Sequence, residues 1–176
     1  MMTQSYFTDA EWSILMQAPV QALSAVILAD KSDPVSFLKE VKAAVQIMLE
    51  EQQRQDLSSD LGRSLIQSFR DSLAKESLQG DELVMKKVFE YLGGIANLKS
   101  ASDGRKQAIA HLDQVSAILA AKVTVMQANE FRQWLVSLAR KVAESVKEEG
   151  FLGIGGERIS RDEASTLKDI EKALQV

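Results

Sequence analysis

The residues that could carry chemistry in this chain are a single histidine and 25 acidic side chains, and there is no cysteine to assist them. Disulfides, thiolate metal sites and cysteine nucleophiles are therefore excluded. Helical metal sites commonly pair an inward histidine with a glutamate three residues before it, but Ala108 holds that position relative to His111. A Ser-His-Asp triad assembles from distant positions, yet no G-x-S-x-G elbow accompanies one here. We expect His111 to be a structural histidine at the edge of the core.

Most paired carboxylates stand in the first turn of a predicted helix, where the helix dipole favours negative charge. These pairs are Asp9 and Glu11, Asp81 and Glu82, and Asp162 and Glu163. Glu148 and Glu149 differ, because they stand near a predicted helix C-terminus, where the dipole opposes them. This position indicates a nearby cation, either Arg158 or Arg161, or alternatively a metal ion.

A cluster of glycines in "EEGFLGIGGERIS" (148–160) could form a phosphate-binding loop. Gly150 and Gly155 have the spacing of a Walker A motif, but Gly156 stands where the motif requires lysine. The G-x-G-x-x-G fingerprint also fails, because its third glycine would fall on Arg158. Both motifs follow a strand, whereas this stretch follows a predicted helix. A phosphate site is therefore not expected.

The same stretch fits a corner between two helices. Gly150 stands where a helix commonly ends with a left-handed residue. Phe151, Leu152 and Ile154 would then fold back onto the helix ends. The alternative is a partner-docking or membrane-touching tip, in which these three apolar side chains face outward and form an interaction site.

The elements that must position these residues are predicted to be helices. Thr8 and Glu11 have the spacing of a capping box, as do Ser160 and Glu163. An aromatic content of 6% and only two prolines in 176 residues favour helices over many short strands. We predict an all-α, single-domain bundle of about seven helices that spans residues 1–176.

The expected helix boundaries come from capping residues and breaks in the apolar pattern. Pro34 begins the second helix, whose polar end "EEQQRQ" (50–55) is expected to be solvated, with Glu50 and Arg54 paired. Ser58 or Ser59 caps the third helix. The fourth ends or bends at Gly93-Gly94, the fifth opens behind Asp103, and "KVTVMQANE" (122–130) separates the fifth from the sixth.

Residues 12–29 form an uncharged run whose length alone would suit a membrane span. Polar residues interrupt the run and no basic anchors flank it, so we predict a buried core helix that kinks or restarts at Pro19. The start of the chain lacks a basic signal-peptide region. Together with the absence of cysteine, this favours a cytoplasmic protein without a membrane span.

The charge balance argues against nucleic-acid binding. The chain has 21 basic and 25 acidic residues, a formal net charge of −4. Its basic residues occur as scattered pairs near acidic neighbours rather than as the clustered patch that phosphate binding requires.

Two stretches resemble a family of uncharacterised bacterial helical proteins. They are "EFRQWLVSLARKVAESVKEEGFLGIGGERISRDEASTLKDIEKAL" and "FTDAEWSILMQAPVQALSAVILAD". The shared features are "W-L" near the start of a C-terminal helix, then "G-F-L-G-x-G-G" and a last helix capped by S-x-x-E. The resemblance implies family membership without implying an activity.

The chain also resembles, more distantly, TerB-type tellurite-resistance proteins, which are helical bundles with acidic metal-binding loops. "AVILADKSDPVSFLKEV" and "GGERISRDEASTLKDI" occupy comparable positions, although they lack that family's "D-G" followed by clustered acids. This resemblance implies a divalent metal, with candidate ligands at Asp30, Asp33, Asp162 and Glu163.

From the residues alone we predict no cofactor and a non-catalytic role, as an interaction or stress-associated accessory protein. Its partner would be another protein or a second copy of the chain, bound through an apolar helix face. A TerB-like metal-responsive protein is the alternative, and an enzyme with an unrecognised carboxylate site is the third hypothesis.

Overall fold

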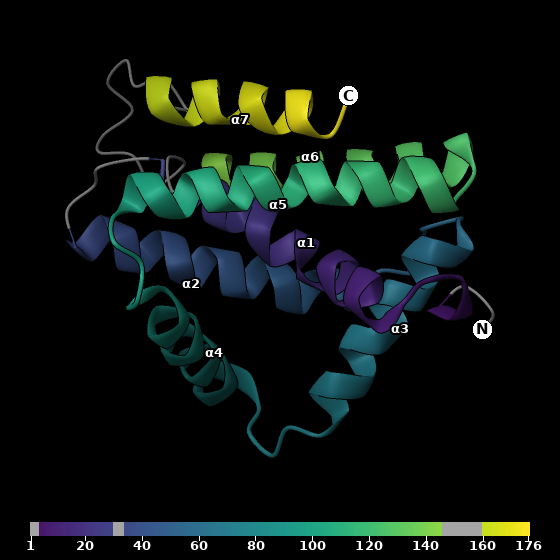
Figure 1. Ribbon diagram of the computed structural model, residues 1–176. Coiled ribbons are helices and arrows are strands. Elements are labelled where there is room, and N and C mark those ends of the chain that lie inside the picture. The colour runs from purple at the N-terminus through teal and green to yellow at the C-terminus, as the bar shows by residue number, and fades with distance from the viewer. Residues whose placement is uncertain (1–3, 30–33, 146–159) are drawn as a thin grey trace.

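The computed structural model describes residues 4–29, 34–145 and 160–176 (Figure 1). Of the described residues 82% are helical, and they form seven α-helices and no strand. This confirms the predicted all-α bundle. After a short 3-10 turn (Gln4–Tyr6) the helices are α1 (Asp9–Ile27), α2 (Pro34–Glu51), α3 (Asp60–Ala74), α4 (Gly80–Ile95), α5 (Ala101–Lys122), α6 (Val125–Ser145) and α7 (Arg161–Ala173).

Helix α1 is the centre of the bundle (Figure 1). It contacts α5, α6 and α7 on one side and α2 on the other. The uncharged run is thus a core helix, as predicted, and Leu15, Ala18 and Ala22 are fully buried. No helix in the described parts of the chain is long and apolar enough to cross a membrane.

Pro19 does not restart this helix, because α1 continues from Asp9 to Ile27 with the proline inside it. Proline removes one backbone donor. Pro19 itself is buried, as are Leu15, Ala18, Ala22 and Leu23 on the same helix, and this packing maintains the helix through the missing hydrogen bond.

Capping residues that are close together in the sequence set where the first and last helices begin. Both predicted capping boxes form, with Thr8 and Glu11 at α1 and Ser160 and Glu163 at α7. The rings of Phe7 and Trp12 lie 5.8 Å apart across the start of α1, as expected for a hydrophobic staple. The chain also breaks between α5 and α6, within the predicted segment.

Three other predictions concern helix boundaries. The structure decides between the two caps expected for α3, and it corrects the expected start of α5 and the expected end of α4. Ser59, rather than Ser58, caps α3 through the N–H of Gly62. Ser100 caps α5, so Asp103 lies in the first turn instead of before it. Helix α4 continues through Gly93-Gly94 to Ile95, since neither glycine adopts the left-handed conformation that would end a helix there.

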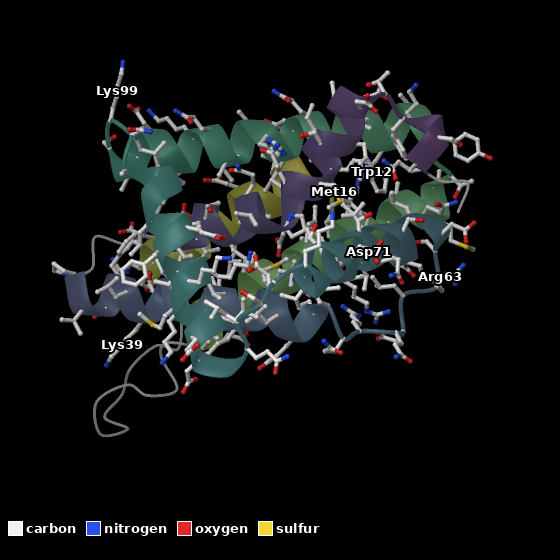
Figure 2. The ribbon with its side chains drawn as sticks, turned by 90° about the horizontal axis from the view of Figure 1, so that it is seen from below. Trp12, Met16, Lys39, Arg63, Asp71 and Lys99 are labelled. Carbon is white, nitrogen blue, oxygen red and sulfur yellow. The ribbon has the colours of Figure 1, made fainter. Side chains whose placement is uncertain are left out.

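Helices α3 and α4 form a V beneath α2 (Figure 1). Helix α3 packs against α6, while α4 packs against α2. Figure 2 views this underside, with Arg63 and Asp71 on α3 and Lys39 on α2. The divergence leaves parts of α2, α3 and α4 facing one another across a groove.

Candidate functional site

The groove inside this V is the candidate functional site. Its volume is about 330 Å³, which lies at the lower end of the 300–1,000 Å³ typical of small-molecule sites. Its walls are mainly apolar and come from four helices. They include Leu23 of α1, Val45, Met48 and Leu49 of α2, and Phe69 and Leu73 of α3.

A hydrogen bond between side chains ties α4 to α1 at the groove. The hydroxyl of Tyr91 donates to Ser24 Oγ over 2.8 Å, and Tyr91 lines the groove. Burial raises the pKa of Tyr91, so its hydroxyl stays protonated and remains a donor at neutral pH. Helix α4 is thereby held to the central helix across the end of the cavity.

A balanced set of charges on α4 and just before it lies beside the groove. Lys87 lies 2.9 Å from Glu76 and 3.3 Å from Glu90, measured between Nζ and carboxylate oxygens. Lys86 also pairs with Glu76, at 2.5 Å. Burial disfavours the Lys87 charge, but hydrogen bonds to Glu76 and Glu90 outweigh this effect and raise its pKa. Of these four residues only Lys87 and Glu90 line the groove, and the group of two lysines and two glutamates has no net charge.

Arg70, which is not among the residues that line the groove, joins α3 to the end of α2. Its Nε donates to the backbone carbonyl of Gln52 at 2.5 Å, and one terminal nitrogen donates to the carbonyl of Arg54 at 2.9 Å. Cationic side chains stabilise the free carbonyls at helix C-termini. Arg70 therefore holds the α3 wall against α2.

Gln52 is the unusual member of the lining. Only 8% of its surface is exposed, and its side-chain Oε1 has no hydrogen-bond partner. Roughly 90% or more of buried polar groups in proteins are hydrogen-bonded. The fold thus leaves the bonding capacity of this buried acceptor unused.

Beside it, Glu51 forms a buried polar cluster that joins α2 to α6. Trp134 Nε1 donates to Glu51 Oε2 at 2.9 Å, Lys141 pairs with Oε1, and Arg54 lies 3.4 Å from Oε2. Burial alone would raise the pKa of Glu51, but the hydrogen bonds from Lys141 and Trp134 lower it overall. Within the stretch 50–55 that was expected to be solvated, Glu51 and Gln52 are buried, while Glu50, Gln53 and Gln55 are exposed as predicted. Arg54 pairs with Glu51 and Asp56 instead of Glu50.

Glu130 joins α6 to the start of α3. Its two oxygens accept from the backbone N–H groups of Ser58 and Ser59 at 2.9 and 3.0 Å, and from both hydroxyls at 2.5 Å. Burial opposes the charge, but these hydrogen bonds lower the pKa of Glu130 to about 2. The carboxylate therefore acts as a structural link.

His111 has the position that the sequence predicts. It is half-buried on α5, and its Nε2 lies 2.8 Å from the backbone carbonyl of Ile14 on α1. Because a carbonyl can only accept, the imidazole donates from Nε2. The histidine links two core helices.

The structure places two of the four metal-ligand candidates. Asp162 is exposed in the first turn of α7, whereas Glu163 is buried and its Oε2 accepts from the backbone N–H of Ser160. Asp30 and Asp33 lie outside the described residues. Within the described ranges, no group of three or more His, Asp or Glu side chains could hold a metal ion.

The other predicted interaction site also falls beyond the described ranges. Phe151, Leu152 and Ile154 all belong to the interval 146–159. Whether they pack inward or form a docking surface therefore stays a prediction, as does the C-cap at Gly150.

Sequence reasoning missed the groove and its unpaired glutamine. The apolar periodicity of α2 and α3 is visible in the sequence and predicts that each helix has a buried face. No local pattern indicates that α3 and α4 diverge, because their divergence depends on which distant helix each one packs against.

Comparisons with known proteins add no relative. No protein-family model matches the chain, and searches of the curated proteins and of the solved structures find no match. The resemblances to the bacterial helical family and to TerB-type proteins therefore stay predictions, and the groove is interpreted from its own geometry.

Proposed function

We propose that this chain is a non-catalytic binding protein that holds an apolar ligand in the groove between α1, α2, α3 and α4. The observation that supports this function is the groove itself, a cavity of about 330 Å³ with apolar walls from four helices. Ligand pockets are typically concave and mostly apolar, with a few polar groups that orient the ligand.

The surrounding polar contacts support the same function. Tyr91 with Ser24, and Arg70 with the end of α2, hold the walls in place from outside the apolar surface. A pre-formed site loses less conformational freedom when a ligand binds. An interaction or accessory role, as predicted from the sequence, would then operate through ligand or partner recognition instead of catalysis.

Nuclear magnetic resonance (NMR) titration with butylbenzene tests this function. We expect shifts of methyl signals from groove residues such as Met48 and Leu73. Val45→Trp would place a large side chain in the groove and abolish these shifts, whereas Gln46→Trp, an exposed neighbour that does not line it, would preserve them. Wild-type spectra without groove shifts, or equal binding by both variants, would refute the proposal.

A further inference from the structure

We infer that a second cavity, between the end of α2 and helix α3, binds a phosphoryl group through Arg54, Arg63 and Arg70. All three arginines line this cavity, whose volume is about 330 Å³. Its described lining contains no aspartate or glutamate and shares no residue with the lining of the apolar groove. The site is therefore separate from the groove and does not depend on the function proposed for it.

Arg70 is held in place by backbone groups and has no acidic partner among the described residues. Its Nε donates to the carbonyl of Gln52 at 2.5 Å, and Nη2 donates to the carbonyl of Arg54 at 2.9 Å. No described residue accepts a hydrogen bond from Nη1, and this nitrogen is not buried. A guanidinium that is fixed before binding loses less conformational freedom when a ligand binds. Arg70 thus presents a positioned cation that a ligand can reach.

Arg54 and Arg63 add two accessible cations to the same cavity. Their side chains are 31% and 57% exposed, and Figure 2 labels Arg63 on α3. Each lies 2.5 Å from a carboxylate, Asp56 or Asp60, that does not line the cavity. A guanidinium has five N–H donors, and hydrogen bonds within the described chain use three at Arg54 and two at Arg63. Both side chains therefore retain donors for a ligand.

The charge and number of these donors favour a phosphoryl group over a carboxylate. Like charges that line one cavity repel one another, and a bound anion offsets this repulsion. A phosphomonoester has three acceptor oxygens and a charge of about −1.5 to −2 at pH 7. A carboxylate has two oxygens and a single charge. The planar fork of arginine also matches the geometry of phosphate oxygens.

Three probes that share a phenyl ring test the inference by NMR titration at pH 7.5. They are phenyl phosphate, benzoate and phenol, which differ in charge and in the number of oxygens. In the wild type, phenyl phosphate should shift the Nε–H signal of Arg70, benzoate should bind more weakly, and phenol should cause no shift. This readout does not depend on the folding of any variant.

Dissociation constants for phenyl phosphate would then be compared among Arg63→Gln, Arg70→Gln and Arg140→Gln. Arg140 is the matched control, because its side chain is 52% exposed and pairs with one carboxylate at 2.5 Å, as that of Arg63 does, but it does not line the cavity. We expect Arg63→Gln to weaken binding by about 2- to 5-fold, the range of an exposed ion pair. Arg70→Gln should weaken it by about 10-fold or more, the range of hydrogen bonds to charged groups. Arg140→Gln should retain the wild-type affinity.

Arg70 also holds α3 to the end of α2, so the wild-type titration and Arg63→Gln decide the test if Arg70→Gln does not fold. The site is refuted if phenyl phosphate leaves the Arg70 signal unchanged, or if Arg63→Gln binds it as tightly as the wild type. An equal loss in Arg63→Gln and Arg140→Gln would show general attraction to positive charge instead of a site. Tighter binding of benzoate would overturn the phosphoryl class. Because butylbenzene tests the apolar groove, either proposal can fail while the other stands.

Discussion

Replacing Glu130 with glutamine tests how α3 is attached to the bundle. The wild-type carboxylate accepts four hydrogen bonds, two from backbone N–H groups and two from the hydroxyls of Ser58 and Ser59. A glutamine retains one oxygen and presents an NH₂ group, itself a donor, to the remaining donors. We expect Glu130→Gln to lower the free energy of unfolding at pH 7.

The pKa of Glu130 sets the size of this effect. It falls from 4.5 to about 2, a difference of about 2.5 units, and each unit corresponds to about 1.36 kcal/mol. The ceiling is therefore about 3.4 kcal/mol. Because the residue is only half-buried, water screens part of the interaction, and we expect a loss of about 1–2 kcal/mol. For a chain of this length the melting temperature would fall by about 2–8 °C.

The pH dependence gives the sharper test. A carboxyl whose pKa is lower in the folded than in the unfolded state contributes its full stability above pH 4.5 and loses it as the pH falls towards 2. Urea titrations followed by circular dichroism should thus show a difference between wild type and Glu130→Gln at pH 7 that shrinks between pH 4.5 and 2. Glu144→Gln, an exposed position on the same helix, is the control. Equal stability at pH 7, or a difference that does not change with pH, would refute the reasoning.

Three further predictions concern the buried polar cluster around Glu51, the metal hypothesis and the predicted helix end at Gly150. Glu51→Gln should lower the free energy of unfolding by about 2–3 kcal/mol in urea titrations, because Lys141 would lose a buried partner, whereas the exposed Glu50→Gln should change it little. Native mass spectrometry with and without calcium or zinc should show no stoichiometric adduct; an adduct that disappears in Asp33→Ala or Asp162→Ala would support the TerB-like alternative. Gly150→Val should destabilise the fold by about 1–2 kcal/mol if the predicted left-handed C-cap is correct, and an unchanged melting temperature would contradict that prediction.

Local signals predicted most of the fold. The capping boxes at Thr8 and Ser160 involve residues three positions apart, so their geometry is contained in a few residues of sequence. The break between α5 and α6 is also local, because Val123 and Thr124 disfavour a continuous helix. Seven helices follow from such signals and from apolar periodicity.

The candidate site could not be predicted in the same way, because it depends on long-range contacts. The stretch that contains Glu51 and Gln52 looks like a polar helix end, and its burial arises from Trp134 and Lys141 on α6 and from Arg70 on α3. Similarly, Glu130 gives no sequence signal as a cap, since its partners lie about 70 residues earlier. Capping by a distant side chain satisfies the same donors as local capping but leaves no motif.

At the end of α2, a carboxylate with both oxygens bonded stands next to an amide oxygen without a partner. Glu51 and Gln52 are neighbours, yet both oxygens of Glu51 are bonded while Oε1 of Gln52 is not. Methionine would suit the apolar walls at position 52, and it would remove an unsatisfied acceptor that costs about 1–3 kcal/mol. We therefore expect Gln52→Met to stabilise the ligand-free protein in urea titrations, with the exposed Gln53→Met as a neutral control. A loss of stability in ligand-free Gln52→Met would contradict this argument, because it would show that the amide already serves the fold.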